Sequence, residues 1–168
     1  MKSGIFTTNN SNTIKGGGVE RIKFRKLHEE AQLPRAQTLG SIGLDIHAFL
    51  LTNEGRPNNL LLPPRFTRNV STGLEIEAPP GKFLMVCSRS GLASKSIFVT
   101  NAPGIIDPDY RGELRVLLYN GGHESQYIRH GDRIAQLLVL QALHIDGEEV
   151  EALSETERGK MGFGSTGL

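Results

Sequence analysis

The chain has 168 residues, which is enough for one domain with a hydrophobic core. Its net charge of +1 lacks the basic excess that duplex nucleic-acid binding normally requires, so we expect no nucleic-acid partner. The single cysteine, Cys87, excludes an internal disulfide and a cysteine-rich zinc site, and no apolar run approaches the roughly 18 residues of a membrane helix. The N-terminal residues show no signal-peptide pattern, so we expect an intracellular, cytoplasmic protein, or one inside a host cell if its source is viral.

The predicted elements begin after a polar leader. Residues 1–18 end in three glycines and are expected to be flexible. From residue 19 onward, short apolar segments alternate with Gly and Pro turn signals, and no helical period is sustained. Only residues 90–96 are expected to form a short helix. The sequence therefore predicts an all-β domain over residues 19–153, a jelly-roll β-sandwich or barrel. Its expected strands cover residues 22–27, 44–51, 59–62, 66–79, 82–88, 97–103, 113–120 and 134–143.

The segment GIIDPDYRGEL at residues 104–114 joins two expected strands and is rich in charge. A hairpin turn needs only one Gly or Asn and some polarity, which this segment exceeds. We expect Asp109, Arg111 and Glu113 to shape the turn and to form salt bridges between strands or subunits.

The C-terminal stretch, residues 154–168, is rich in glycine and cannot bury enough apolar surface to fold alone. One reading is a frayed tail. The other is an arm that closes over phosphates, because glycine N–H groups, hydroxyls and an arginine suit an anion, and one aromatic ring could stack on a base.

Three common catalytic motifs fail. The Gly-Lys pairs at 81–82 and 159–160 lack the hydroxyl residue of a Walker A loop. The His-Glu pairs at 28–29 and 123–124 lack the second histidine of a zincin. No Gly-x-Ser-x-Gly elbow is present, so serine hydrolase chemistry has no support.

Five segments stand out by composition, and their order and spacing resemble the five motifs of the trimeric dUTP pyrophosphatases (dUTPases). They are SIGLDIHA (41–48), SRSGLASK (88–95), NAPGIIDPDYRGEL (101–114), GDRIAQLL (131–138) and RGKMGFGSTG (158–167). The resemblance implies a jelly-roll subunit, a homotrimer, and active sites that are each assembled from all three chains. The implied reaction converts dUTP and water to dUMP and pyrophosphate with Mg²⁺. It would keep uracil out of DNA and supply dUMP for thymidylate synthesis.

The resemblance assigns the nucleoside to residues 101–114. Asp107 matches the carboxylate that orients and activates the attacking water, and Tyr110 matches the ring that packs on the deoxyribose and excludes a 2′-hydroxyl. Asn101, Gly104 and Ile106 match substrate-binding positions of the same motif. The alternative readings are a turn aspartate that caps its own backbone and an ordinary sheet aromatic.

The resemblance assigns the phosphates to three other motifs. Arg89, Ser90 and Gly91 match binders of the α- and β-phosphates, at a helix start where N–H groups favour an anion. Gln136 matches a further phosphate contact, and Asp45 matches the aspartate linked to Mg²⁺ through water. The alternatives are a buried amide that satisfies strand backbone and an aspartate with a structural hydrogen bond.

The last motif implies a lid. Phe163 would stack on the uracil, and Arg158, Gly164, Ser165 and Thr166 would close over the β- and γ-phosphates. Binding energy from these remote groups would align the α-phosphorus with the water.

The sequence departs from the family pattern at three positions. Ser88 stands where the family usually has Pro, which we expect to loosen the preceding turn. Met161 replaces a common Gly in the arm, and Leu44 replaces an aromatic residue. We also expect Asp132 and Arg133 to form an internal ion pair.

Three rival functions remain. A dCTP deaminase would carry a glutamate on the strand after residue 112, but the corresponding position is Leu117, which cannot move protons. A nucleotide-responsive regulator could use residues 1–18 to dock a protein partner. A capsid-like structural jelly roll would leave the phosphate motifs unexplained.

Overall fold

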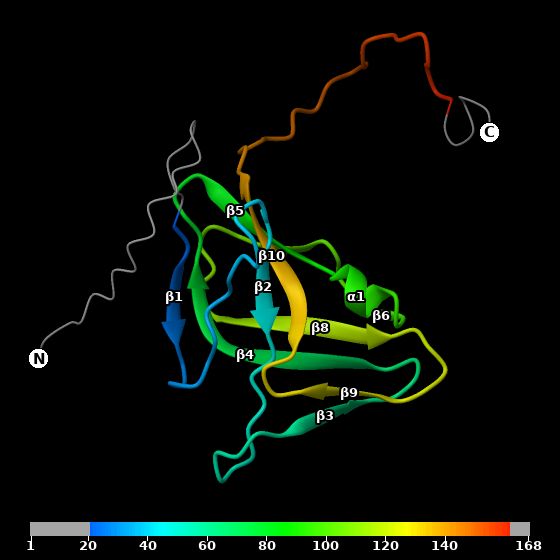
Figure 1. Cartoon of the computed structure of the whole chain (residues 1–168). Helices are drawn as coiled ribbons and strands as arrows, with labels where there is room; N and C mark the ends of the chain where they lie inside the picture. The colour runs from blue at the N-terminus through cyan, green and yellow to red at the C-terminus, as the bar shows by residue number, and fades with distance from the viewer. Residues whose placement is uncertain (1–20, 162–168) are drawn as a thin grey trace, which may run out of the picture.

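The computed structural model describes residues 21–161, and this part of the chain consists mainly of strands and loops, as predicted (Figure 1). Its only helix is the short α1 (Ser90–Ala93), which confirms the helix expected there. The strands are β1 (Lys23–Lys26), β2 (Leu44–His47), β3 (Asn59–Leu62), β4 (Thr67–Glu77), β5 (Lys82–Cys87), β6 (Ile97–Val99), β7 (Gly104–Ile106), β8 (Glu113–Asn120), β9 (Gln126–Arg129) and β10 (Arg133–Gln141).

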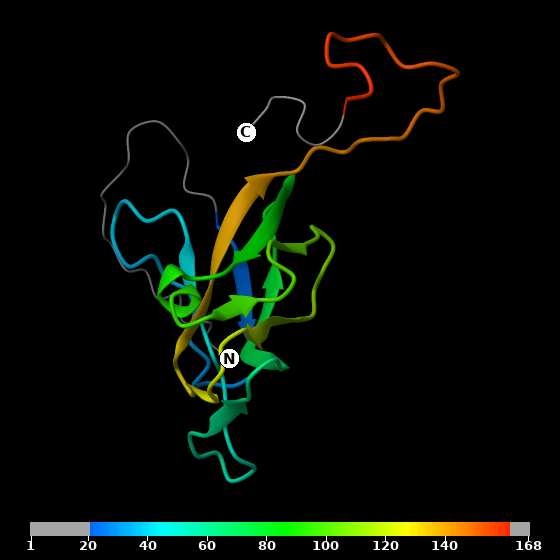
Figure 2. The ribbon, with the colours of Figure 1, turned by 90° about the vertical axis from the view of Figure 1, so that its right-hand side faces the viewer.

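Two four-stranded antiparallel sheets share one hydrophobic core (Figures 1 and 2). One has the strand order β1-β4-β8-β6 and the other has the order β2-β10-β5-β7, while β3 and β9 form a separate pair. Along β8, Leu114, Val116 and Leu118 are buried and alternate with more exposed residues. Because successive side chains point to opposite faces of a strand, each sheet buries one face against the other. The predicted jelly-roll sandwich is confirmed.

A glycine interrupts the regular pairing of β4 next to Phe49. Gly73 has a φ of 65°, and a Cβ added there would lie 2.9 Å from the ring of Phe49. The pairing of β4 with β8 shifts register between Ser71 and Glu75, around this glycine. Only glycine adopts this backbone conformation without cost. The start of β8 is therefore held against an irregular part of its partner strand.

Two short strands escaped the sequence prediction. In β9, only Ile128 is buried and Tyr127 is 61% exposed, so the apolar alternation is too weak to identify a strand. The strand β7 lies inside residues 104–114, which were expected only to join the strands at 97–103 and 113–120. β7 pairs with β5, while β8 pairs with β4 and β6. The charged connection therefore crosses from one sheet to the other.

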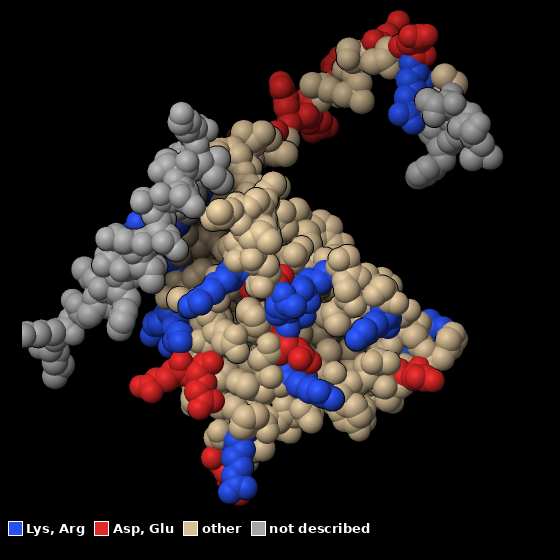
Figure 3. Space-filling view, in the orientation of Figure 1, with Lys and Arg blue, Asp and Glu red and all other residues tan. Residues whose placement is uncertain are grey.

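After β10 the chain leaves both sheets and extends away from the body (Figures 1, 2 and 3). Residues 143–161 are all exposed and contain no strand. They include the end of the segment assigned to the β domain and the first half of the predicted arm. The predicted leader, residues 1–18, lies outside the described residues. Nowhere in residues 21–161 is a helix long and apolar enough to cross a membrane.

Candidate active site

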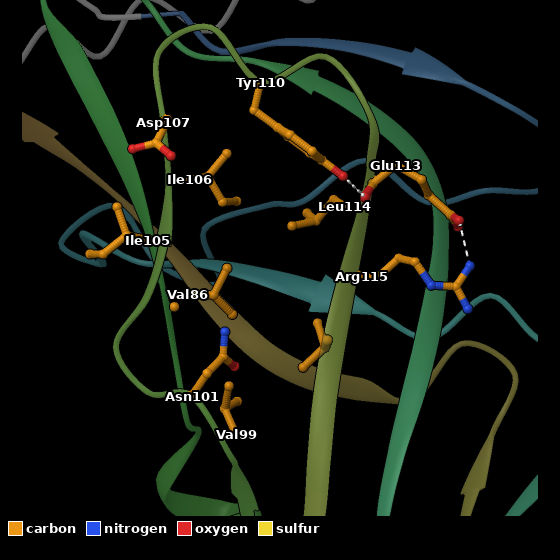
Figure 4. Close-up of a pocket in the computed structure, with 12 residues that line it drawn as sticks. Val86, Val99, Asn101, Ile105, Ile106, Asp107, Tyr110, Glu113, Leu114 and Arg115 are labelled. Atoms are coloured by element: carbon orange, nitrogen blue, oxygen red, sulfur yellow. Dashed lines mark hydrogen bonds and ion pairs between the residues drawn. The ribbon is translucent and has the colours of Figure 1, made fainter.

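A pocket of about 220 Å³ lies beneath the crossing between β7 and β8 (Figure 4). This is smaller than the roughly 300–1,000 Å³ of pockets that enclose drug-sized ligands. Apolar side chains from both sheets form its walls, and polar groups gather around them. The lining residues are Val86, Val99, Asn101, Gly104, Ile105, Ile106, Asp107, Tyr110, Glu113, Leu114, Arg115 and Val116. The pocket thus brings together Asn101, Gly104, Ile106, Asp107 and Tyr110, the residues of the 101–114 motif that the resemblance assigned to the nucleoside.

One wall of the pocket depends on glycine, which has no side chain, at position 104. Gly104 is buried on β7, and a Cβ there would lie 3.2 Å from Asn101 Nδ2 and 3.5 Å from Val86 Cβ. Glycine therefore allows the Asn101 amide to lie close to the β7 backbone. Among the described residues, no hydrogen-bond partner holds that amide, so it remains available to a ligand.

Asp107 and Tyr110 belong to one turn, but only the Tyr110 side chain has a hydrogen-bond partner in the described part of the chain. The backbone N–H of Tyr110 donates to the Asp107 carbonyl at 3.1 Å, which closes the turn. The Asp107 carboxylate is exposed and has no hydrogen bond or ion pair to any residue from 21 to 161, so it does not cap its own turn. The Tyr110 ring hangs between β7 and β8, and its hydroxyl donates to the Glu113 carbonyl at 2.8 Å (Figure 4).

Glu113 was expected only to shape the turn and form a salt bridge, but it anchors the pocket edge. Its carboxylate accepts hydrogen bonds from the Ser71 hydroxyl, from the Gly73 N–H at 3.1 Å and from Arg115 Nη1 at 2.6 Å. Burial alone would raise the pKa of Glu113, but these hydrogen bonds outweigh burial and lower it. Arg111 shapes the turn as expected: Nη1 donates to the Pro108 carbonyl at 2.8 Å and Nε lies 3.6 Å from Glu77.

A second polar cluster surrounds Asp45 on β2. Asp45 is 1% exposed, and its carboxylate accepts from Arg89 Nε at 3.0 Å, Arg133 Nη1 at 3.2 Å and Gln136 Nε2 at 3.4 Å. Arg133 therefore pairs with Asp45, and the expected pair with Asp132 is wrong. Asp132 precedes β10, and its Oδ2 atom accepts a hydrogen bond from the Arg129 N–H at 2.8 Å. A buried carboxylate between two guanidiniums leaves the cluster with a net positive charge.

The cluster offers little to a metal ion by itself. Both carboxylate oxygens of Asp45 already accept hydrogen bonds from cationic or amide groups. Within residues 21–161, no group of three His, Cys, Asp or Glu side chains is placed to hold an ion. Next to the cluster, burial lowers the pKa of His47, and its Nδ1 atom has no hydrogen-bond partner in the described structure. Direct coordination of Mg²⁺ by Asp45 does not fit this donor set.

Ser90 and Gly91 begin α1 with exposed backbone. A Cβ at Gly91 would meet no atom within 4 Å, so packing inside this chain does not require glycine there. Ser88, just before them, accepts a hydrogen bond from the Val99 N–H at 2.9 Å. This hydrogen bond ties the end of β5 to β6 and opposes the loosening expected from the loss of Pro.

The pocket that contains Asp107 and the Asp45 cluster lie at opposite edges of one sheet. β7 and β2 are its outer strands, with β5 and β10 between them. Three strand spacings of about 4.8 Å separate the two edges by about 14 Å. Arg89, Gly91 and Arg133 line a different groove, which shares no residue with the pocket that contains Asp107. One chain therefore does not bring the two groups of predicted site residues together.

The remaining predictions fall on the arm and on β8. Arg158 Nε donates to the Met161 carbonyl at 3.2 Å in an exposed turn far along the extended chain. Phe163, Gly164, Ser165 and Thr166 lie outside the described residues. Leu117, at the position considered for a deaminase glutamate, is 36% exposed and is not among the residues that line the pocket.

Comparison with known proteins gives a consistent result. A family model described as dUTPase matches residues 29–167. A deoxyuridine 5'-triphosphate nucleotidohydrolase of Treponema denticola is 47% identical over 146 residues, covering 86% of this chain and 97% of the relative. The corresponding protein of Nautilia profundicola is 40% identical over 148 residues, covering 88% of this chain and 99% of the relative.

Solved structures support the fold. A mutant dUTPase of Staphylococcus bacteriophage 80alpha with dUpNHpp matches with a TM-score of 0.77 at 23% identity, covering 89% of this chain and 100% of that one. A mutant dUTPase from phage phi11 of S. aureus, described with a structural Mg(II) ion, matches with a TM-score of 0.69 at 21% identity, covering 80% of this chain and 99% of that one.

Proposed function

Because this chain belongs to the dUTPase family and is a dUTP-hydrolysing enzyme, we propose that Asp107 activates the water that attacks the α-phosphate of dUTP. The carboxylate accepts a proton from the water, the water oxygen bonds to the α-phosphorus, and the bond to the leaving pyrophosphate breaks. The product is dUMP, which supplies thymidylate synthesis, and removal of dUTP keeps uracil out of DNA.

The observation that carries this proposal is the state of the Asp107 carboxylate. It lines the pocket, is exposed, and is engaged by no other group in the described part of the chain. A general base must reach its proton within hydrogen-bond distance, and an unpaired carboxylate at a pocket edge can do so. A carboxylate that capped its own turn would be occupied.

The pocket suits a deoxynucleoside. Tyr110 packs against the deoxyribose and leaves no space for a 2′-hydroxyl, while Ile106 adds apolar contact. Asn101 and the backbone beside Gly104 meet the polar edge of uracil. A base with the wrong pattern of hydrogen-bond donors leaves these polar groups unpaired. Such a mismatch discriminates between bases more strongly than the loss of one methylene group does.

The phosphates bind at the Asp45 cluster. Arg89 uses Nε on Asp45 and Nη1 on the Arg133 carbonyl, and its Nη2 group has no partner in residues 21–161. This group, the exposed N–H groups of Ser90 and Gly91, and the Gln136 amide form the proposed contacts to the α- and β-phosphates.

The triphosphate would be the main holder of Mg²⁺ at this site. The donor set around Asp45 does not fit direct coordination, so Asp45 would contact the ion through water. Mg²⁺ commonly keeps its waters and is held mainly by substrate phosphates. When bound, the ion neutralises charge on the phosphates.

A homotrimer with shared sites would bring together the pocket and the Asp45 cluster, which are separated within one chain. The pocket of one chain and the Asp45 cluster of a second chain would face each other, and the C-terminal arm of a third would cover them. The extended stretch 143–161, which contacts little of its own chain, supports this arrangement. In it Arg158, Gly164, Ser165 and Thr166 close on the phosphates and Phe163 stacks on uracil.

The test is an assay of pyrophosphate and nucleotide product with dUTP, dCTP, dTTP and UTP in turn. We expect pyrophosphate and dUMP from dUTP alone. Asp107→Asn lowers kcat by roughly 10²–10⁴-fold, the usual contribution of a positioned base. The matched control is Asp109→Asn in the same turn, since Asp109 does not line the pocket. A deaminated product from dCTP, or equal losses in the two variants, would contradict the proposal.

A further inference from the structure

We propose that Glu113 is a positioning residue for Tyr110 and thereby sets the discrimination between deoxyribose and ribose. This inference rests on the sugar contact proposed above for Tyr110. The Glu113 carboxylate points along the sheet, away from the turn that carries Tyr110, so its role in substrate selection is indirect (Figure 4).

Tyr110 depends on the backbone of residues 112 and 113 for its position. Its ring belongs to a residue that is 43% exposed, so burial does not hold it firmly. Its hydroxyl donates to the Glu113 carbonyl at 2.8 Å. The ring lies on Gly112, where a Cβ would stand 2.5 Å from the hydroxyl oxygen. Any shift of this backbone therefore moves the surface on which the deoxyribose would rest.

Side chains hold this backbone where the regular ladder fails. β4 and β8 pair at Ser71 with Arg115 and again at Glu75 with Glu113, with a register shift between these pairs. In that interval the Gly73 N–H donates to the Glu113 carboxylate at 3.1 Å instead of to a strand carbonyl. The carboxylate substitutes for a ladder partner at the first residue of β8.

Two further donors fix the carboxylate itself. The Ser71 hydroxyl donates to one oxygen, and Arg115 Nη1 donates to the other at 2.6 Å. Arg115 is held in turn, because its Nε donates to Asn69 Oδ1 at 2.9 Å. Glu113 is thus the point where contacts from β4 and β8 meet, one residue from the glycine that supports Tyr110.

The decisive variant is Glu113→Gln, which keeps the size of the side chain and removes its charge. We expect the ratio of kcat/KM for dUTP to kcat/KM for UTP to fall about tenfold, because small displacements of a positioning group cost rate steeply. The matched control is Glu75→Gln. Glu75 stands opposite Glu113 on β4, but its side chain pairs with Arg25, at the far edge of the sheet. In Glu75→Gln, the ratio of kcat/KM for dUTP to kcat/KM for UTP should stay within about twofold of the ratio in the parent protein.

A second readout does not require turnover. The chain has three tyrosines, so ¹³Cζ-labelled tyrosine gives a simple NMR spectrum in which Tyr110→Phe identifies one signal. In Glu113→Gln that signal should shift or broaden, and in Glu75→Gln it should not. If the parent protein does not hydrolyse dUTP, the proposed function fails while the spectrum still decides whether Glu113 positions Tyr110. An unchanged Tyr110 signal, or an unchanged ratio with active protein, would overturn the inference.

Discussion

Asp45 and Arg89 are 44 residues apart in sequence, yet their side chains form an ion pair of 3.0 Å in which Asp45 is 2% and Arg89 20% exposed. The pair joins the edge strand β2 to the loop before α1. It therefore gives Asp45 a structural function in addition to any function at the phosphates.

The first prediction concerns the stability that this pair contributes. Asp45→Asn leaves two guanidiniums beside a buried neutral group, so the free energy of unfolding should fall by about 3 kcal/mol. Urea denaturation measures the loss. The control is Glu54→Gln, because Glu54 and Arg56 form a pair of 3.6 Å with side chains 74% and 79% exposed. It should change the free energy by less than about 0.5 kcal/mol. Equal effects would show that burial of the Asp45 pair is unimportant.

The second prediction concerns Ser88. Ser88→Ala removes the acceptor of the Val99 N–H and should lower the free energy of unfolding by about 1 kcal/mol. Ser94→Ala is the comparison, since the Ser94 hydroxyl donates only to an exposed carbonyl in the same turn, that of Gly91, at 3.2 Å. The proposal that Ser88 ties β5 to β6 fails if the two variants unfold at the same denaturant concentration.

The third prediction concerns the seat of the Tyr110 ring. Gly112→Ala places a Cβ 2.5 Å from the Tyr110 hydroxyl oxygen and 2.8 Å from Cζ, so the ring must move. We expect kcat/KM for dUTP to fall by about 10²-fold. Gly40→Ala serves as control, because a Cβ at Gly40 meets no atom within 4 Å. Steady-state kinetics on both variants decide the matter, and parental kcat/KM in Gly112→Ala would refute the assigned contact.

The fourth prediction concerns pH. The hydrogen bonds to Glu113 lower its pKa in the folded protein, so its contribution to stability is complete above the unfolded pKa of about 4.3 and is lost as pH falls through the lower, folded value. The stability difference between the parent and Glu113→Gln should therefore be constant near neutral pH and shrink below about pH 4.3. Ser71→Ala, which removes one donor, should move this loss to higher pH. Denaturant titrations at several pH values test both, and a difference independent of pH would contradict the assignment.

The fifth prediction concerns Mg²⁺. Chelation of Mg²⁺ by EDTA should abolish dUTP hydrolysis, because the negative charge of the phosphates is then not neutralised. Added Mg²⁺ should restore hydrolysis. Calorimetry should find no tight binding of Mg²⁺ to the protein alone, since the oxygens of Asp45 are occupied by Arg89, Arg133 and Gln136. A submicromolar site for the free ion would show that the protein, and not the triphosphate, holds the metal.

Local pattern was enough to predict much of the fold. Short apolar segments between Gly and Pro turn signals correctly indicated β-sandwich strands, and charge density singled out residues 104–114, several of which line the pocket. The weakly apolar β9 and the three-residue β7 carry too few buried side chains to be recognised.

The contacts that hold the site could not be read from local pattern. Glu113 meets Ser71, 42 residues away, and no spacing rule connects them. The separation of Asp45 from Asp107 follows from strand order, which depends on how the two sheets pack. Sequence motifs name candidate site residues, but not which of them stand together in one chain.

The positions of β2 and β7 at opposite edges of one sheet have a genetic consequence. Under the proposed trimer, a chain disabled at Asp107 still presents an intact phosphate half, and a chain disabled at Arg89 still presents an intact nucleoside half. When the two inactive chains assemble into one trimer, some sites combine the intact phosphate half of one chain with the intact nucleoside half of the other. Two defective copies can then complement each other, and a cell or virus that carries both would regain part of its activity.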